Sequence, residues 1–108
     1  MLYELRIYEA MPGKLPAVSA RFENHALRFF EKHGINVVGF WTTAVGPSSN
    51  ELTYLLAFEN MADREKRWAA FATDPDWLAT KRETERDSPI VANIRNQFLV
   101  PTNYSPLK

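Results

Sequence analysis

Few side chains in this sequence could carry out chemistry, and its two histidines, His25 and His33, stand out among them. His25 lies between Phe22 and Phe29 on one apolar helical stripe, so we expect it to point toward the sheet as the candidate catalytic proton shuttle. The histidines are eight residues apart, about 12 Å along a helix, and cannot ligate one metal ion together. Because cysteine is also absent, we expect no metal site and no cofactor. A single histidine would still be enough to hold haem.

A second group of residues has the chemistry of a ligand site. A guanidinium binds carboxylates through paired hydrogen bonds, and aromatic rings pack against flat apolar groups. Arg6 would hold a carboxylate or an enolate, and Trp41 or Tyr54 would pack against a ring. The ligand-binding candidates are Arg6, Tyr8, Trp41, Tyr54 and Arg95.

Arg6 raises an electrostatic question of its own. Strand alternation places it beside Tyr8, and close to Arg95 if the first and last strands are neighbours. Two buried guanidiniums without acids would repel each other and lose hydration. Either an acid such as Glu4 or Glu59 neutralises them, or an anionic ligand does.

Seven segments with strand or helix periodicity must position these residues. Alternation predicts strands over 2–9, 35–45, 52–59 and 92–100. Apolar stripes predict a helix over 14–33, a second after the N-cap Asn60, and a third from the N-cap Asp74 to about Arg86. The order β-α-β-β-α-β predicts an α+β, ferredoxin-like fold with a four-stranded antiparallel sheet. We expect residues 1–108 to form one domain, with 101–108 as a C-terminal tail.

The predicted strands give the sheet two different faces. We expect the helices to cover an apolar face that carries Leu5, Ile7, Val38, Phe40, Tyr54, Leu56, Phe58, Ile94 and Phe98. The opposite face would carry Arg6, Tyr8, Trp41, Thr43, Thr53, Leu55, Arg95, Gln97 and Leu99. Such a large, partly apolar surface is typical of a partner interface. We therefore expect a homodimer through this face, and a ligand cavity either between the two sheets or between helices and sheet.

Composition excludes several classes of partner. The chain has 13 basic and 13 acidic residues among 108, so no overall field attracts nucleic acid or anionic lipid. No stretch reaches the roughly 18 apolar residues of a membrane span, and charges interrupt the first residues where a signal peptide needs an apolar run. We expect a cytoplasmic protein with no nucleic-acid or membrane partner.

Short motifs spread along the whole chain resemble those of the NIPSNAP family. They are YELRIY at 3–8, PGK at 12–14, GFWTT at 39–43, GP at 46–47, NE at 50–51, Arg64, Arg67, DP at 74–75, Trp77, FLVPT at 98–102 and YSPL at 104–107. The resemblance implies a dimeric α/β barrel of the ferredoxin-like kind. It brings no catalytic motif, so the biochemical activity stays open. Relatives of that fold include cofactor-free monooxygenases of the antibiotic-biosynthesis type and haem-dependent dismutases or peroxidases.

Three hypotheses for function follow. The leading one is a NIPSNAP-like homodimer that binds a small organic ligand, anionic or aromatic. The alternative is a cofactor-independent monooxygenase or isomerase of the antibiotic-biosynthesis type, in which His25 moves a proton. The third is an interaction module whose sheet face binds another protein. A closed pocket with convergent polar groups would favour the first two, and a solid interior would favour the third.

Overall fold

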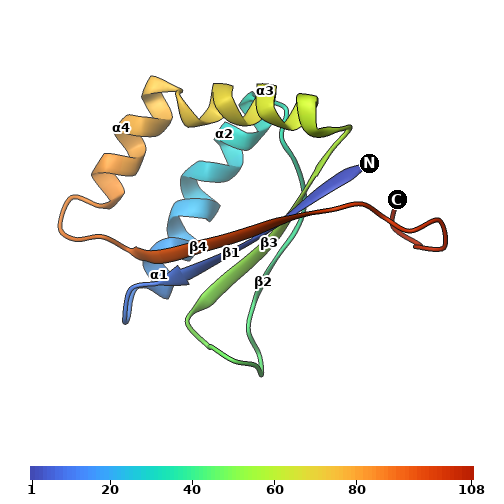
Figure 1. Cartoon of the computed structure of the whole chain (residues 1–108). Helices are drawn as coiled ribbons and strands as arrows, with labels where there is room; N and C mark the ends of the chain where they lie inside the picture. The colour runs from blue at the N-terminus through green and yellow to red at the C-terminus, as the bar shows by residue number, and fades with distance from the viewer.

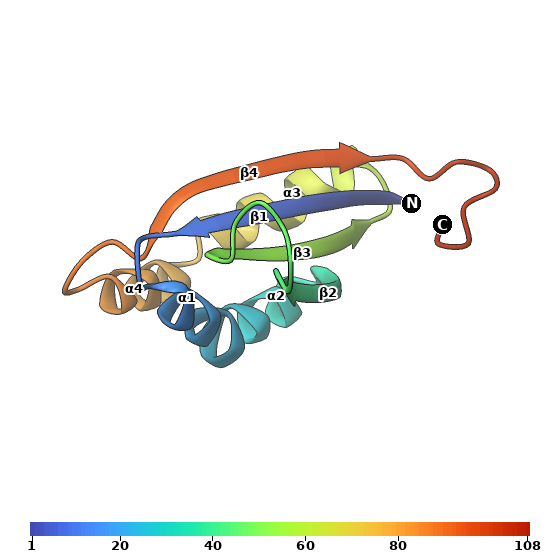
Figure 2. The ribbon, with the colours of Figure 1, turned by 90° about the horizontal axis from the view of Figure 1, so that it is seen from below.

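The computed structural model describes all residues, 1–108, as one sheet with helices on a single face (Figure 1). The antiparallel strands are β1 (Leu2–Ala10), β2 (Asn36–Thr42), β3 (Glu51–Phe58) and β4 (Val91–Leu99), in the order β2-β3-β1-β4. The helices are α1 (Leu15–Arg21), α2 (Leu27–Lys32), α3 (Met61–Ala72) and α4 (Pro75–Thr84), with the π-helical η1 (Phe22–Ala26) between α1 and α2. The predicted ferredoxin-like α+β fold is confirmed. Figure 2 shows the uncovered face of the sheet and the C-terminal segment extending beyond β4.

Helix boundaries follow the capping signals in the sequence. The side chain of Asn60 accepts a hydrogen bond from the backbone N–H of Asp63 at 2.8 Å and so caps α3. Asp74 caps α4 in the same way, and Pro75 occupies the first helical position. Gly34 has a φ of 68° just beyond α2, where a left-handed residue ends the helix. No helix of the chain combines the length and the apolar character that crossing a membrane requires.

A π-helical turn, η1, interrupts the first helix and links α1 to α2. A π turn holds one residue more than an α turn, so it changes the phase of the side chains that come before it. The buried residues of α1 are Val18 and Arg21. Those of η1 are Phe22 and Ala26, and Phe29 is buried on α2. The π turn therefore lets both parts of the helix turn a buried stripe toward the sheet.

The core between helices and sheet is built mainly from aromatic rings. Phe22 lies with its ring centroid 5.0 Å from that of Tyr54 on the central strand β3. Phe71 of α3 is in contact with Phe30 of α2 and Trp77 of α4, with centroids 5.0 and 4.9 Å away. Each such pair adds about 1 kcal/mol to the stability gained from burial alone. These contacts join α2, α3 and α4 to one another.

Strand β1 turns the opposite side from the predicted one toward the helices. Glu4, Arg6 and Tyr8 are buried beneath the helices, whereas Leu5 and Ile7 lie on the open face. The prediction for these β1 side chains is therefore wrong. Burial of the polar residues is possible because each finds hydrogen-bond partners there, as described below.

The register of the sheet fixes the two faces. Arg6 lies opposite Tyr54 of β3, so it shares the helix-covered face with Phe40, Leu56, Phe58, Ile94 and Phe98, which lie as predicted. Leu5 lies opposite Leu55 and Gln97. The open face carries Leu5, Ile7, Trp41, Thr53, Leu55, Arg95, Gln97 and Leu99.

Strand β2 contains a bulge between Val37 and Gly39. The extra residue, Val38, is 42% exposed, although its alternation predicted a core position, and Val37 packs against the core instead. The strand also ends at Thr42, earlier than predicted, so Thr43 lies in the loop that leads to β3 and not on the open face.

Asp74 ties the start of α4 to the end of α2. Its Oδ2 accepts a hydrogen bond from Lys32 Nζ at 2.8 Å and lies 2.7 Å from His33 Nε2. The bonds from Lys32 and then His33 hold the pKa of the Asp74 carboxyl well below its usual range. His33 is thus a structural residue of this junction.

We expect Asp74 to make the fold sensitive to acid. Its lowered pKa stabilises the protein fully above the unfolded carboxyl pKa of about 3.9, and this stabilisation declines as the pH falls further. Asp74→Asn keeps an N-cap acceptor but loses the charge, so its melting temperature should fall less between about pH 5 and pH 2. Circular dichroism melts measure this, with the exposed Asp87→Asn as control. Equal acid sensitivity in Asp74→Asn and wild type would contradict the prediction.

Candidate functional site

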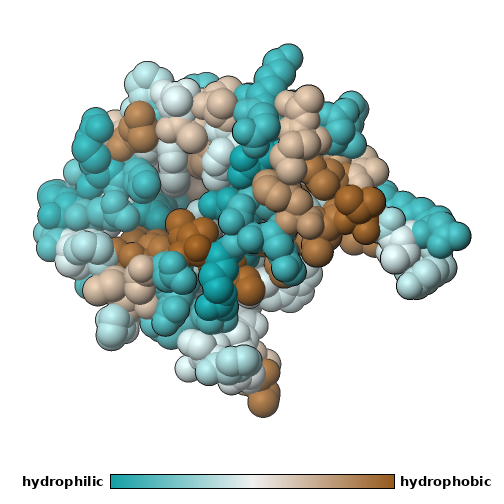
Figure 3. Space-filling view, viewed as in Figure 1, coloured by the Kyte–Doolittle hydropathy of each residue, from teal (hydrophilic) through white to brown (hydrophobic).

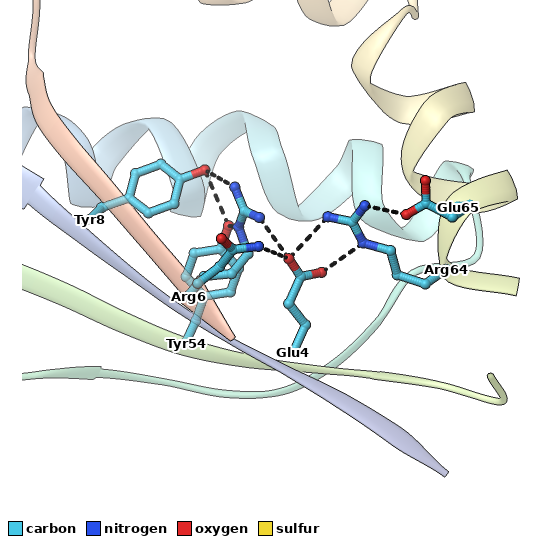
Figure 4. A network of polar contacts seen from close by, with 7 residues as sticks. Glu4, Arg6, Tyr8, Tyr54, Arg64 and Glu65 are labelled. Carbon is cyan, nitrogen blue, oxygen red and sulfur yellow. Dashed lines mark hydrogen bonds and ion pairs between the residues drawn. The ribbon is translucent and has the colours of Figure 1, made fainter. Parts of the chain in front are cut away.

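A buried carboxylate, that of Glu4, is the centre of a polar network beneath the helices (Figure 4). Its Oε2 accepts hydrogen bonds from Arg6 Nη1 at 2.8 Å and Arg64 Nη2 at 3.0 Å, and its Oε1 accepts one from Arg64 Nε at 3.0 Å. Asn96 Nδ2 of β4 adds a fourth bond at 2.9 Å. Burial acts to raise the pKa of the Glu4 carboxyl, but these hydrogen bonds outweigh it and keep the pKa below its usual value.

The Arg6 guanidinium is held in a fixed position by its neighbours. Its Nε donates to the Tyr54 hydroxyl at 2.8 Å, and its Nη2 donates to the Tyr8 hydroxyl at 3.3 Å. The indole of Trp68 lies over the guanidinium, 4.3 Å from ring centroid to Cζ. Burial raises the pKa of the Tyr54 hydroxyl well above its usual value, so this group stays protonated and donates to Tyr8 at 3.3 Å.

The network retains a positive charge. One buried carboxylate, Glu4, serves the two guanidiniums of Arg6 and Arg64. The second acid near Arg64 is Glu65, which is 64% exposed and screened by water. An acid therefore neutralises Arg6 only in part, and the site attracts negative charge or electron-rich oxygen.

A cavity of about 540 Å³ lies between α3, α4 and the first half of β4, with Arg6 in its wall. Nine of its 14 lining residues are hydrophobic, and its aromatic residues are Tyr8, Trp68, Phe71 and Trp77. The other charged residues of its wall are Arg21, Lys81 and Glu85. Figure 3 shows apolar patches toward the two ends of β4, with hydrophilic groups between and around them. A space of this size and lining suits a small organic molecule.

The structure brings together three of the five predicted ligand-binding residues. Arg6 and Tyr8 line the cavity, and Tyr54 lies fully buried behind them, bonded to both. Trp41 and Arg95 are on the open face of the sheet and do not belong to this site. Arg95 lies opposite Ile7 and pairs with Glu51 at 3.1 Å, so the expected approach of Arg95 to Arg6 is wrong.

His25 lies outside the cavity wall. It is half-buried on η1, and its Nδ1 is 3.1 Å from Nη2 of the exposed Arg28. The expectation that it points into the core is wrong, because Phe22 and Ala26 are the residues that η1 buries. Its catalytic role stays a prediction without support from this geometry. No group of three or more His, Cys, Asp or Glu side chains is placed to hold a metal ion.

Arg64 is a site residue that sequence reasoning missed. The charged run REKR at 64–67 suggests a solvated helix face. Arg67 fits that description, since its side chain is 41% exposed and pairs with Asp63. Arg64 is only 11% exposed and reaches Glu4. Its spacing of four from the aromatic Trp68 on the same helix was the available signal, because such residues share a helix face.

Comparisons with known proteins confirm the family resemblance. A family model described as NIPSNAP matches residues 3–106. A solved NIPSNAP family protein with unknown function from Agrobacterium tumefaciens is 30% identical, with 100% of this chain and 94% of that chain covered and a TM-score of 0.86. A NIPSNAP domain protein from Burkholderia xenovorans is 24% identical, with 98% and 99% covered and a TM-score of 0.85.

A more distant structure shares the fold. It is a putative antibiotic biosynthesis monooxygenase from Nitrosomonas europaea, 14% identical, with 94% of this chain and 98% of that chain covered and a TM-score of 0.64. No protein of curated function matches the sequence. Activity is therefore to be inferred from the site itself.

Arg6→Met should lower the free energy of unfolding by about 3 kcal/mol, because it removes a partner from the buried Glu4 carboxylate and from the Tyr54 hydroxyl. Urea denaturation measures the change. Arg86→Met is a matched control, since Arg86 is 69% exposed, and it should cost less than about 0.5 kcal/mol. An Arg6→Met protein as stable as wild type would show that Glu4 does not depend on Arg6.

Proposed function

The chain belongs to the NIPSNAP family, and from this premise we propose that it binds a small organic molecule in the cavity between α3, α4 and the sheet. The observation that carries the proposal is the wall of that cavity, in which a fixed guanidinium lies beside several aromatic rings. The cavity volume of about 540 Å³ is within the usual range for ligand sites, roughly 300 to 1,000 Å³.

Arg6 supplies the polar part of the proposed site. A guanidinium has five N–H donors in a planar fork, and Arg6 uses three of them for Tyr54, Glu4 and Tyr8. The remaining donors and the partly balanced charge favour an oxygen-rich or anionic group on the ligand. Because Arg6 is already fixed, binding costs little side-chain entropy.

The aromatic walls supply the apolar part. Trp68, Phe71 and Trp77 form a continuous series, with centroids 5.1 Å apart for the first pair and 4.9 Å for the second. Rings in this arrangement give large contact area to a flat or alicyclic molecule. The favoured ligand is therefore an aromatic or polyketide-like compound with oxygen substituents.

A cofactor-independent monooxygenase is the second candidate. It is favoured by the Arg6 guanidinium and the Tyr8 hydroxyl in the cavity wall, which are donors that would stabilise an enolate or phenolate before it reacts with oxygen. The fold shared with the Nitrosomonas protein is an analogy only. Oxygen uptake on addition of an electron-rich polyphenol, lost when the cavity is blocked, would favour this candidate over binding alone.

We further propose that the open face of the sheet pairs with a second copy of the chain. Trp41 and Leu99 are 51% and 41% exposed there, next to Leu5, Ile7 and Leu55. Because β1 places Leu5 and Ile7 outward, this face is more apolar than the sequence alone suggested. Two such faces stacked about 10 Å apart would remove it from water.

Blocking the cavity should abolish ligand binding. Protein purified from its own host should retain a small molecule in native mass spectrometry, and Ala72→Phe, which fills the cavity wall on α3, should lose it. The control Ala70→Phe is on the same helix and equally exposed, but outside the cavity, and should retain the molecule. At one hundred times its Kd, the same molecule should stabilise wild type by about 2.7 kcal/mol. Equal retention by both variants would place the ligand elsewhere.

Leu55→Asp should convert the proposed dimer to monomer or aggregate in sedimentation, because it places a charge at the centre of the apolar open face. Val45→Asp is the control, since Val45 is 98% exposed in the loop between β2 and β3. Wild-type protein that sediments as a folded monomer at micromolar concentration would contradict the proposed interface.

A further inference from the structure

We infer that the cavity contains a carboxylate-binding subsite at Arg21 and Lys81, so that its ligand is an aromatic or apolar acid whose carboxylate replaces that of Glu85. This inference rests on the proposed function and adds the chemical class of the ligand. Arg21 ends α1, and Lys81 and Glu85 lie one turn apart at the end of α4. All three line the cavity.

Arg21 is a buried cation with unused donors. The residue is only 4% exposed, yet its Nε has no hydrogen-bond partner. Its Nη1 donates to Glu85 Oε1 at 3.2 Å, a long bond for an ion pair. A buried donor without a partner costs free energy and is rare in proteins. A ligand carboxylate in place of that of Glu85 would be free to form the shorter bonds that a carboxylate and a guanidinium prefer.

The side chain of Glu85 shows that the subsite accepts a carboxylate. Its carboxylate already lies against Arg21, but its side chain is 31% exposed and makes no other ion pair. It lies at the C-terminal end of α4, where the helix dipole disfavours negative charge. A carboxylate held so weakly can be displaced by one from a ligand.

Lys81 adds a second positive charge without an acid of its own. Its ammonium forms no ion pair, although the side chain lines the cavity. At the Arg21 end of the cavity, two cations, Arg21 and Lys81, accompany one carboxylate, that of Glu85. This end therefore has an excess positive charge. The excess favours an acid over a neutral ligand.

A series of rings connects this subsite to Arg6. Trp77 lies 5.9 Å from the Arg21 guanidinium, and Phe71 and Trp68 follow it along the wall. Trp68 then contacts Arg6. The two guanidiniums thus mark the ends of one aromatic wall, which fits a ligand with a carboxylate at one end and an oxygen acceptor at the other.

The test compares acids with their amides. Isothermal titration would use 2-naphthoate and 2-naphthamide, with benzoate and 3-phenylpropionate and their amides as further pairs. Wild type should bind the acids about tenfold more tightly than the amides. Glu85→Gln removes the competing carboxylate, so it should tighten acid binding about tenfold further and leave amide binding unchanged. Arg21→Met should remove most of the preference for acids, and Arg21→Lys should retain part of it if the methionine variant does not fold.

Controls separate the possible failures. Arg82→Met removes an exposed charge from α4 outside the cavity and should leave both affinities unchanged, which excludes an effect of net charge. Equal binding of acids and amides, unaffected by Glu85→Gln, would overturn the subsite while leaving the ligand cavity in place. Binding of no compound in either form would contradict the proposed function and this inference together.

Discussion

The fold and its candidate site both depend on one buried charge, the carboxylate of Glu4. A carboxylate without contact to water is stable only among cations and donors, and Glu4 finds them on its own strand, on β4 and on α3. The same bonds fix α3 over the sheet and hold Arg6 in the cavity wall. Packed apolar side chains would join helix and sheet as well. Apolar packing could not, however, hold a guanidinium fixed in the cavity wall, as Glu4 does for Arg6.

The phase of β1 couples two surfaces of the molecule. By turning Glu4, Arg6 and Tyr8 beneath the helices, the strand gives the cavity its polar wall. The same rotation leaves Leu5 and Ile7 on the open face. Alternate side chains of a strand point to opposite faces, so the orientation of β1 alone produces both the polar interior and the apolar exterior. The proposed ligand site and the proposed dimer interface are thus two results of one arrangement.

The helix caps could be predicted from the sequence, whereas the side of β1 that faces the helices could not. Caps such as Asn60 and Asp74 act within one helical turn, and their positions were predicted correctly. The predicted phase of β1 is wrong because hydrophobicity ranks Leu5 above Arg6 for burial, while Tyr54 and Trp68, which help Arg6 to be buried, come from distant segments. The cavity depends on how α4 packs over β4, which no periodicity encodes. The pairing of Arg6 with Tyr54 of β3, which sets this phase, is visible only in the folded sheet.

The π turn at Phe22–Ala26 makes chain length here as critical as chemistry. Each residue of an α-helix turns about 100°, so a continuous α-helix of the same length, without the π turn, would rotate the whole of α1 by about that angle relative to α2. Val18 would leave the core, and the guanidinium of Arg21 would leave the cavity wall. The extra residue and the π turn therefore belong together, because a chain shorter by one residue here would form a continuous α-helix that presents the same faces.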